Sequence, residues 1–271
     1  MDLIAVGEVL VDVSAPALLP GRAVHAPVRL RAGGTPVNAA FAAASLGGRA
    51  TVVGRVGDDF AAGAIRSALG VAGIEAVLAI DDEASTGTFV EAGEGAAKAI
   101  VTDRGASARL AAEDVPAMLA AGAVLVSGYA LLQEDTAPAA AAAIARADAR
   151  WVAVSLAAPR LIERLGRRDV DARAAGANVL LANAEEAGAL TGLGPDDAAV
   201  ELARRYELAC VTKGGEGAVA AAGARVERVE ATGRDVTGAG DAFAGALLVA
   251  LAGGADLGHA LATARDAAAA A

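Results

Sequence analysis

The sequence has few of the residue types on which several protein classes depend. Its 271 residues include one cysteine, Cys210, and two histidines, His25 and His259. A disulfide within one chain is therefore impossible, and a zinc site or a Ser-His-Asp triad has little to draw on. Cys210 lies in the apolar run 208–211, which predicts a buried and inert thiol.

Positive charge is also scarce. Lys98 and Lys213 are the only lysines, and the formal net charge is −10. We therefore expect neither a nucleic acid nor an anionic membrane as a partner. Neither lysine follows a glycine, which excludes the G-x-x-x-x-G-K-[ST] phosphate-binding loop. A G-x-G-x-x-A match that begins at Gly215 runs into residues 224–229, which predict a strand, whereas a dinucleotide fingerprint needs a helix there.

Membrane spans and secretory leaders are not indicated. The N-terminus, Met1 to Ile4, contains an acid and no basic region, so we expect a cytoplasmic protein. The uncharged stretch 115–133 is long enough to span a bilayer, but Pro116 and two glycines interrupt it. Residues 124–126 predict a buried strand instead.

Small apolar residues are abundant. The chain is 55% hydrophobic, which is enough for a sizeable core, and we expect one domain over residues 1–271. Short apolar runs alternate with longer helical stretches, which predicts βαβ units on a largely parallel sheet. The expected strands cover residues 3–6, 50–53, 124–126, 151–154, 179–181 and 209–211; the expected helices cover 37–46, 60–72, 137–147 and 195–206. Residues 23–32 and 86–101 break the alternation and predict a small, half-exposed sheet.

The most informative motif is Asp235-Val236-Thr237-Gly238-Ala239-Gly240-Asp241, followed by an apolar stretch. Small residues let the backbone approach a ligand closely, and their N–H groups at a helix N-terminus can converge on an anion. Asp241 at the edge of that anion could accept a hydroxyl proton as a phosphoryl group arrives. The alternative is that Asp241 only caps the helix.

A second motif lies upstream, where Gly33 and Gly34 precede a small-residue helix that carries Asn38 in its first turns. Asparagine is a mediocre helix former but has both a hydrogen-bond donor and an acceptor, so Asn38 suits the binding of a polyol hydroxyl.

These two motifs together resemble the signatures of the ribokinase-like family of sugar and nucleoside kinases, the PfkB carbohydrate kinases. Collinear landmarks at 7–12, 53–59, 104–110, 183–186 and 212–217 agree. The resemblance implies a three-layer αβα fold with a mostly parallel central sheet and a small β-sheet lid, whose strands come from about 23–32 and 86–101. It also implies ATP and Mg²⁺ as cofactors and a small-molecule acceptor.

The resemblance also implies a role for each matching residue. Asp241 would be the catalytic base, and the amides of Gly238, Ala239 and Gly240 would form an anion hole. The sugar contacts would come from Asp12, Gly33, Gly34 and Asn38. Glu186 would act on Mg²⁺ through water. The nucleotide would be bound by Asn183, Thr212, Gly214 and Gly217, while Lys213 either reaches a phosphate or stays in solvent.

Three features differ from the family pattern. An Asp-x-Asn-x-Arg element is reduced to Arg160, which either binds a phosphate or carboxylate of the substrate or lies on the surface. Tyr129 stands where ribokinases carry a glutamate. The family usually continues into a segment that closes the adenine pocket and holds a monovalent cation. Here Asp235 could supply part of a K⁺ site, whose other half the sequence does not show.

We therefore expect an ATP-dependent kinase for a hydroxyl, preferably a primary one, of a small sugar, sugar acid or nucleoside. The opening residues 7–12 resemble fructokinases and 2-keto-3-deoxygluconate kinases most. A non-catalytic sugar or nucleotide sensor that retains the fold is the alternative. Exposed lid strands favour a homodimer in which two lids clasp.

Overall fold

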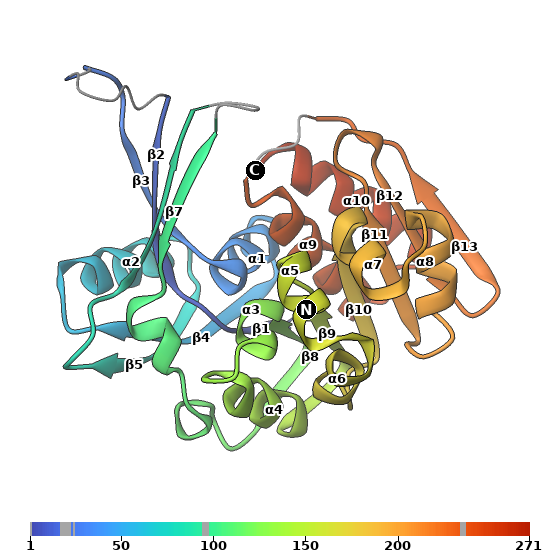
Figure 1. The fold of residues 1–271 in the computed structure, drawn as a ribbon, viewed down its shortest axis with the longest axis horizontal. Coiled ribbons are helices and arrows are strands. Elements are labelled where there is room, and N and C mark those ends of the chain that lie inside the picture. Colours follow the sequence, from blue (N-terminus) through green and yellow to red (C-terminus); the bar gives the residue numbers. More distant parts are fainter. Residues whose placement is uncertain (1, 17–22, 24, 94–97, 234–236) are drawn as a thin grey trace.

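The computed structural model describes residues 2–16, 23, 25–93, 98–233 and 237–271. Within these residues, a main sheet of nine strands has the order β13-β12-β11-β10-β9-β8-β1-β4-β5 (Figure 1). Its strands are β1 (Asp2–Val6), β4 (Arg49–Gly57), β5 (Glu75–Asp81), β8 (Leu119–Ser127), β9 (Ala147–Ser155), β10 (Val179–Asn183), β11 (Leu208–Thr212), β12 (Ala218–Ala222) and β13 (Arg225–Val229).

The main sheet is largely parallel. Neighbouring strands from β5 to β11 all pair in parallel, and only β12 and β13 pair antiparallel to their neighbours. The predicted parallel sheet is therefore confirmed. The suspected dinucleotide fingerprint runs into β12, so its exclusion is also confirmed.

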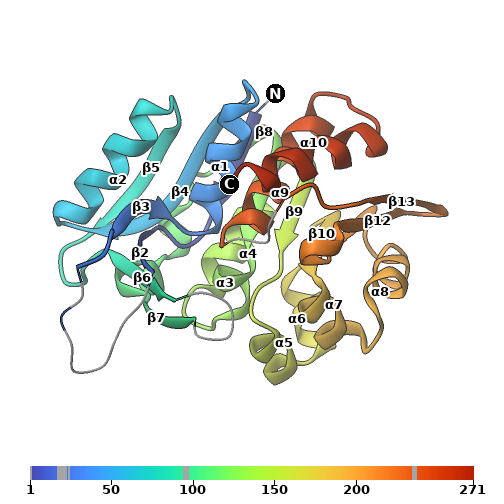
Figure 2. The same ribbon diagram turned by 90° about the horizontal axis from the view of Figure 1, so that it is seen from above.

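Helices cover both faces of this sheet (Figure 2). One face carries α1 (Thr35–Ser45), α2 (Phe60–Val71), α9 (Ala239–Ala252) and α10 (Leu257–Ala269). The other carries α3 (Gly128–Leu132), α4 (Ala137–Ala145), α5 (Pro159–Leu165), α6 (Arg167–Arg173), α7 (Ala184–Thr191) and α8 (Pro195–Leu202). Helices α4 and α8 end before their predicted limits, because the chain turns there into β9 and β11. No helix in the described ranges is long and apolar enough to cross a bilayer.

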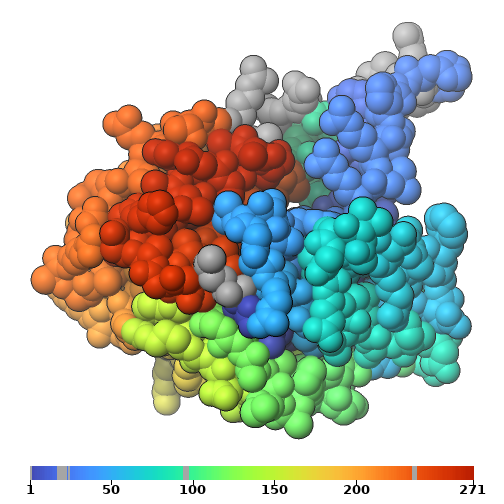
Figure 3. Space-filling model, turned by 180° about the vertical axis from the view of Figure 1, so that it is seen from behind, coloured from blue at the N-terminus to red at the C-terminus, as the bar shows by residue number. Residues whose placement is uncertain are grey.

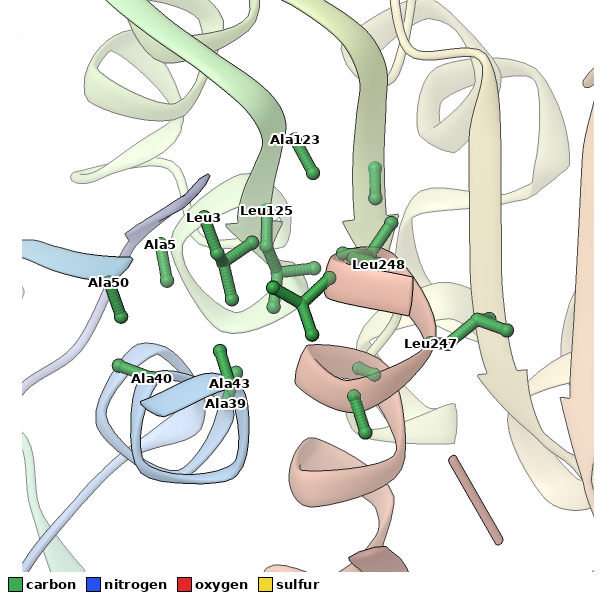
Figure 4. Packing of buried hydrophobic residues seen from close by; sticks show 14 of the residues in the cluster. Leu3, Ala5, Ala39, Ala40, Ala43, Ala50, Ala123, Leu125, Leu247 and Leu248 are labelled. Atoms are coloured by element: carbon green, nitrogen blue, oxygen red, sulfur yellow. The ribbon is translucent and has the colours of Figure 1, made fainter. Parts of the chain in front are cut away.

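The core lies in two layers, one on each face of the sheet. Successive strand side chains point to opposite faces, so Leu125 joins the layer under α1 and α9 while Val124 and Val126 join the layer under α3 and α4. Figure 4 shows Leu125 packed with Leu3 and Leu248 between the sheet and the helices α1 and α9. Alanine at many buried positions brings helices and sheet close together without large aromatics.

Helices α1 and α9 lie in close contact. A Cβ atom at Gly245 of α9 would lie only 2.1 Å from the carbonyl oxygen of Ala39 in α1, so only glycine permits this approach. The space-filling view shows blue residues of the region that includes α1 beside the red C-terminal region that includes α9 and α10 (Figure 3). The contact between α1 and α9 places Asn38 of α1 beside Asp241 in the first turn of α9.

The lid is a second sheet, of four strands in the described residues, with the order β3-β2-β6-β7. Its strands are β2 (Leu10–Ala15), β3 (Arg29–Gly33), β6 (Gly87–Ala92) and β7 (Ala99–Asp103), and they project beyond the body (Figure 1). The expected strand over residues 23–32 begins only at Arg29, because no ladder bonds reach residues 25–28. Strand β2 was missed as a lid strand: its middle residues are half-buried, as in a sheet exposed on one side.

Candidate active site

A cavity with a volume of about 620 Å³ lies between the lid and the carboxyl ends of the main-sheet strands. Ligands in open α/β sheets bind at this edge. Lid residues such as Asp12 and Phe89 line one side, and Asn183 and Thr212 after the strands line the other. Cys210 also borders the cavity, but burial raises the pKa of its thiol to about 12, which confirms the inert thiol expected for this position.

Asn38 and Asp241 meet at the base of this cavity. The Asn38 Nδ2 atom donates a hydrogen bond of 3.0 Å to Asp241 Oδ2. Burial raises the pKa of Asp241, whereas hydrogen bonds from the side chains of Asn38 and Thr35 act in the opposite direction. A desolvated carboxylate with a raised pKa is a competent proton acceptor near neutral pH.

Asp241 is not the cap of its helix. Gly238, in a left-handed conformation with φ of 88°, is the N-cap residue of α9, and Asp241 lies in the first turn. The interpretation of Asp241 as only a helix cap is therefore wrong. The first N–H groups of a helix have no intrahelical acceptor, and the first bond is donated by Ala242 to Gly238. The N–H groups of the first turn, which have no acceptor within the helix, thus lie at the end of α9 that carries the carboxylate.

Gly240 differs from the other glycines around the cavity. It lines the cavity, and a Cβ atom there would meet nothing within 4 Å. By contrast, a Cβ at Gly33 would lie 2.1 Å from Asp12 Oδ2, and one at Gly34 would lie 2.2 Å from the carbonyl oxygen of Glu8. At Gly34, where φ is 97° and the neighbour is backbone, the packing of the protein itself requires glycine. At Gly33 the neighbour is the side chain of Asp12, and at Gly240 the Cβ position is open.

Asp12 extends the acidic surface of the cavity into the lid. Burial, together with the negative charges of Asp241 and Glu91, raises the pKa of Asp12 to about 6. Arg31 pairs with Asp12 in the ladder between β2 and β3, and its positive charge lowers the pKa of Asp12. Asp12, Asn38 and Asp241 all line this cavity. The roles that the resemblance to the family implies for them stay predictions.

Asn183 and Glu186 form a capping box at the start of α7. The Asn183 side chain accepts a bond of 2.8 Å from the Glu186 amide, and Glu186 Oε2 accepts one of 2.9 Å from the Asn183 amide. Burial raises the pKa of Glu186 to about 7, with a smaller contribution from the charge of Asp241. The local sequence thus fixes the Glu186 carboxyl group at the edge of the cavity.

A second cavity of about 210 Å³ adjoins the first. It is lined by residues from the predicted nucleotide turn and by α10: Asn183, Thr212, Gly214, Gly217, Ala239, Gly240, Arg265, Ala268 and Ala269 are among them. The two cavities share Asn183, Thr212 and Gly240, which places the glycine-rich loop between them.

Three predicted site residues do not line either cavity. Gly33 ends β3, Arg160 is exposed on α5, and Lys213 pairs with Asp196 at 3.5 Å; none of the three is among the described residues that line the two cavities. Asp235 lies outside the described residues. Across the described parts of the chain, no three or more His, Cys, Asp or Glu side chains are grouped to hold a metal ion.

The structure adds Glu8 to the site, which sequence reasoning passed over. It follows β1, lines the cavity, and accepts hydrogen bonds from the Thr35 amide (3.0 Å) and the Ser127 hydroxyl (2.6 Å). A charged residue directly after a buried strand was the available signal, because that position faces the ligand edge of a parallel sheet.

A contact between the lid and the glycine-rich loop was also missed. Lys98 in the lid donates a hydrogen bond of 2.7 Å to the Thr237 hydroxyl, and it forms an ion pair with Glu91 at 2.5 Å. The Thr237 hydroxyl in turn donates a hydrogen bond of 2.6 Å to the Glu91 carboxylate. The lid is therefore bonded to the residue that precedes Gly238.

Comparisons with known proteins agree with this geometry. The family described as "pfkB family carbohydrate kinase" matches residues 1–271 of this chain. The bifunctional protein HldE of Azorhizobium caulinodans is 34% identical over 258 residues, which cover 86% of this chain and 51% of that protein. The chain thus spans about half the length of this curated relative.

Solved structures of similar fold include two with at least 25% identity. The adenosine kinase from Sinorhizobium meliloti has a TM-score of 0.83 and 26% identity, covering 98% of this chain and 92% of that one. The fructokinase from Vibrio cholerae has a TM-score of 0.80 and 25% identity, covering 99% and 97%. A putative ribokinase II from E. coli, solved with ATP and Mg²⁺, has a TM-score of 0.84, 19% identity and coverage of 99% and 91%.

Fold and site together define a kinase that transfers phosphate to a hydroxyl group. The chain belongs to the pfkB family of carbohydrate kinases. Its ribokinase-like architecture, with the mostly parallel main sheet and the smaller sheet, confirms the fold expected from the sequence.

Proposed function

We propose that this enzyme transfers the terminal phosphoryl group of ATP to a hydroxyl, preferably a primary one, of a small sugar, sugar acid or nucleoside. The observation that carries the proposal is the position of Asp241. It is a half-buried carboxylate that accepts a hydrogen bond of 3.0 Å from Asn38, and it lies in the first turn of α9 at the 620 Å³ cavity.

The acceptor occupies the end of the cavity between lid and body. Asp12 and Asn38 bind its hydroxyl groups there, and Asp241 accepts the proton of the reacting hydroxyl. The acceptor oxygen forms its bond to the terminal phosphorus while the bond from that phosphorus to the ADP oxygen breaks. The N–H groups at Gly238, Ala239 and Gly240 stabilise the charge that develops on the transferred group.

The nucleotide occupies the second cavity, beyond the glycine-rich loop. Thr212, Gly214 and Gly217 line it on one side and Arg265 on α10 on the other. Gly240 belongs to both cavities, so the terminal phosphate lies at their junction. The open space where Gly240 lacks a Cβ atom supports this placement, because no contact within the protein requires a glycine there.

Glu186 is the residue that fits Mg²⁺. Its carboxylate already interacts with the backbone amides of Asn183 and Ala158, and each carboxylate oxygen can accept a further hydrogen bond, such as one from a water bound to the metal. Magnesium supplies positive charge to the phosphates when bound. The raised pKa of Glu186, about 7, means that its carboxyl group must lose a proton before it can hold a cation.

The assembly we propose is a homodimer joined through the lids. Leu30 on β3 is 67% exposed and Val101 on β7 is 67% exposed, and both belong to edge strands of the lid sheet. Edge strands with apolar side chains are covered in stable proteins. Sedimentation velocity at micromolar concentration should show a dimer that the double variant Leu30→Glu, Val101→Glu dissociates; a wild-type monomer would contradict this assembly.

Release of ADP with a panel of acceptors tests the function. Ribose, fructose, 2-keto-3-deoxygluconate and adenosine sample the acceptor classes, and at least one should give release that depends on both acceptor and Mg²⁺. If an acceptor raises the melting temperature but none gives turnover, the chain is a sensor and the proposed function is wrong.

A further inference from the structure

Glu8 is a buried acid in the site that the transfer reaction has not yet used. We propose that Glu8 is a positioning residue for phosphoryl transfer, which holds the start of α1 so that Thr35 and Asn38 present their side chains to Asp241. This inference rests on the proposed role of Asp241 as the base. It adds a residue that reaches the reaction only through its neighbours.

The two oxygens of Glu8 join segments that are far apart in the sequence. Oε1 accepts the amide of Thr35, the first residue of α1, at 3.0 Å. Oε2 accepts the hydroxyl of Ser127, the last residue of β8, at 2.6 Å. One carboxylate therefore fixes the first turn of α1 to the carboxyl edge of the main sheet.

That first turn carries both groups that contact Asp241. The Thr35 side chain donates a hydrogen bond to Asp241, and Asn38, three residues further along α1, donates the other at 3.0 Å. The Asn38 amide bonds to the Gly34 carbonyl at 3.0 Å, which makes the turn one rigid unit. A rotation of this turn would move both donors away from Asp241 together.

The hydrogen-bond directions favour a charged Glu8. Ser127 Oγ accepts a hydrogen bond of 3.2 Å from the Tyr129 amide, and the Ser127 hydroxyl donates its own proton to Glu8. Protonation of Glu8 would turn one of its two accepting oxygens into a hydroxyl, whose proton would compete with the donor at that oxygen. Burial raises the pKa of Glu8, and these two donors work against that shift.

The backbone around Glu8 has no room to adjust. A Cβ atom at Gly34 would lie 2.2 Å from the Glu8 carbonyl oxygen, and one at Gly7 would lie 2.5 Å from Ser127 Cβ. Gly34 also has a φ of 97°. Residues 7 and 8 are thus packed between the start of α1 and the end of β8, so the carboxylate cannot follow a displaced helix.

The charge of Glu8 faces a defined set of titratable groups. Asp241 on α9, Asp12 on β2 and Tyr129 on α3 interact with it electrostatically. Repulsion from Asp241 raises the pKa of Glu8. Because this repulsion is mutual, a negative charge on Glu8 also opposes the ionised form of Asp241. Glu8 thereby combines two effects, the geometry of the first turn of α1 and the basicity of Asp241.

Two substitutions separate these effects. Glu8→Ala removes the anchor, and we expect a fall in kcat of about 10-fold to 100-fold with a change in acceptor KM below about threefold, since the acceptor contacts at Asp12 remain. Glu8→Gln keeps an oxygen for the Thr35 amide and removes the charge. It should recover most of kcat, while the acid limb of the kcat/KM profile moves to lower pH.

A purely structural Glu8 would give another pattern. Glu8→Ala would then lower the melting temperature and change kcat and KM together, and Glu8→Gln would leave the pH profile in place; either result overturns the proposal. The carboxyl ¹³C titration of Asp241 by NMR provides a readout without turnover. A lower Asp241 pKa in Glu8→Gln supports the inference even if no acceptor in the panel is phosphorylated, and an unchanged one contradicts it.

Discussion

The side chains of Asn38 and Asp241 are 203 residues apart in the sequence, and a hydrogen bond of 3.0 Å joins them. The bond depends on how closely α1 and α9 approach. Alanine and glycine fill the contact between these helices, and Gly245 lies against the carbonyl oxygen of Ala39. The small-residue composition therefore has a direct consequence for the site, because it sets the distance between the proposed base and its partner.

Gly245→Ala tests this link between packing and activity. The added methyl group would overlap the Ala39 carbonyl, which lies 2.1 Å from the new Cβ position. We expect a loss of about 1–3 kcal/mol in the free energy of unfolding, together with a fall in kcat as α9 moves away from α1.

Gly63→Ala is the matched control, since Gly63 is exposed on α2 and its Cβ position has nothing within 4 Å. In that variant the free energy of unfolding should rise by roughly 0.5–1 kcal/mol, and full activity should remain. Chemical denaturation followed by ADP release measures both quantities. Normal stability and turnover in Gly245→Ala would show that the helix contact does not control the site.

Gly240→Ala separates the needs of the ligand from those of the fold. Because the Cβ position is open, the melting temperature should stay the same or rise slightly. The methyl group would occupy the space proposed for the transferred phosphate. Loss of one hydrogen bond to a charged group corresponds to about 10-fold to 100-fold in kcat/KM for ATP. A stable variant with wild-type kcat/KM would place the phosphate elsewhere.

The Mg²⁺ requirement should depend on pH through Glu186. This carboxyl group has a pKa of about 7, so below pH 7 protons compete with the cation, and above pH 7 the carboxylate is free. The Mg²⁺ concentration for half-maximal rate should rise about tenfold for each pH unit below 7 and level off above it.

Glu186→Gln should raise the Mg²⁺ concentration for half-maximal rate at every pH, and this concentration should no longer depend on pH. The amide oxygen can still accept the Asn183 amide, so the capping box and α7 are retained. Glu113→Gln, at an exposed position that lines neither of the two cavities, is the control and should behave like the wild-type enzyme. An unaltered Mg²⁺ titration in Glu186→Gln would exclude Glu186 from metal binding.

The sequence predicted the parts of the structure that depend on neighbouring residues. The apolar strand runs and the helix start at the glycine-rich loop before Asp241 are local patterns. The resemblance to the family gave Asn38 and Asp241 roles in one site, but neither the bond between them nor the capping box of Asn183 and Glu186 was predicted.

The features that were missed depend on distant contacts. Glu8 gains its role from Thr35 and Ser127, which are 27 and 119 residues away. The bond from Lys98 to Thr237 spans 139 residues. Strand β2 was not assigned to the lid because residues 10–15 follow β1 closely, and only pairing with β3 and β6 distinguishes the two sheets.

The most direct test of the account is the turnover of Asp241→Asn. This substitution is nearly isosteric and removes the proton acceptor, while the acceptor contacts at Asp12 stay in place. Calorimetry should give an acceptor Kd within a few-fold of the wild-type value. The kcat for ADP release, measured at saturating ATP and Mg²⁺ with the best acceptor, should fall by roughly 10²-fold or more. An unchanged kcat would show that Asp241 is not the base and would contradict the mechanism.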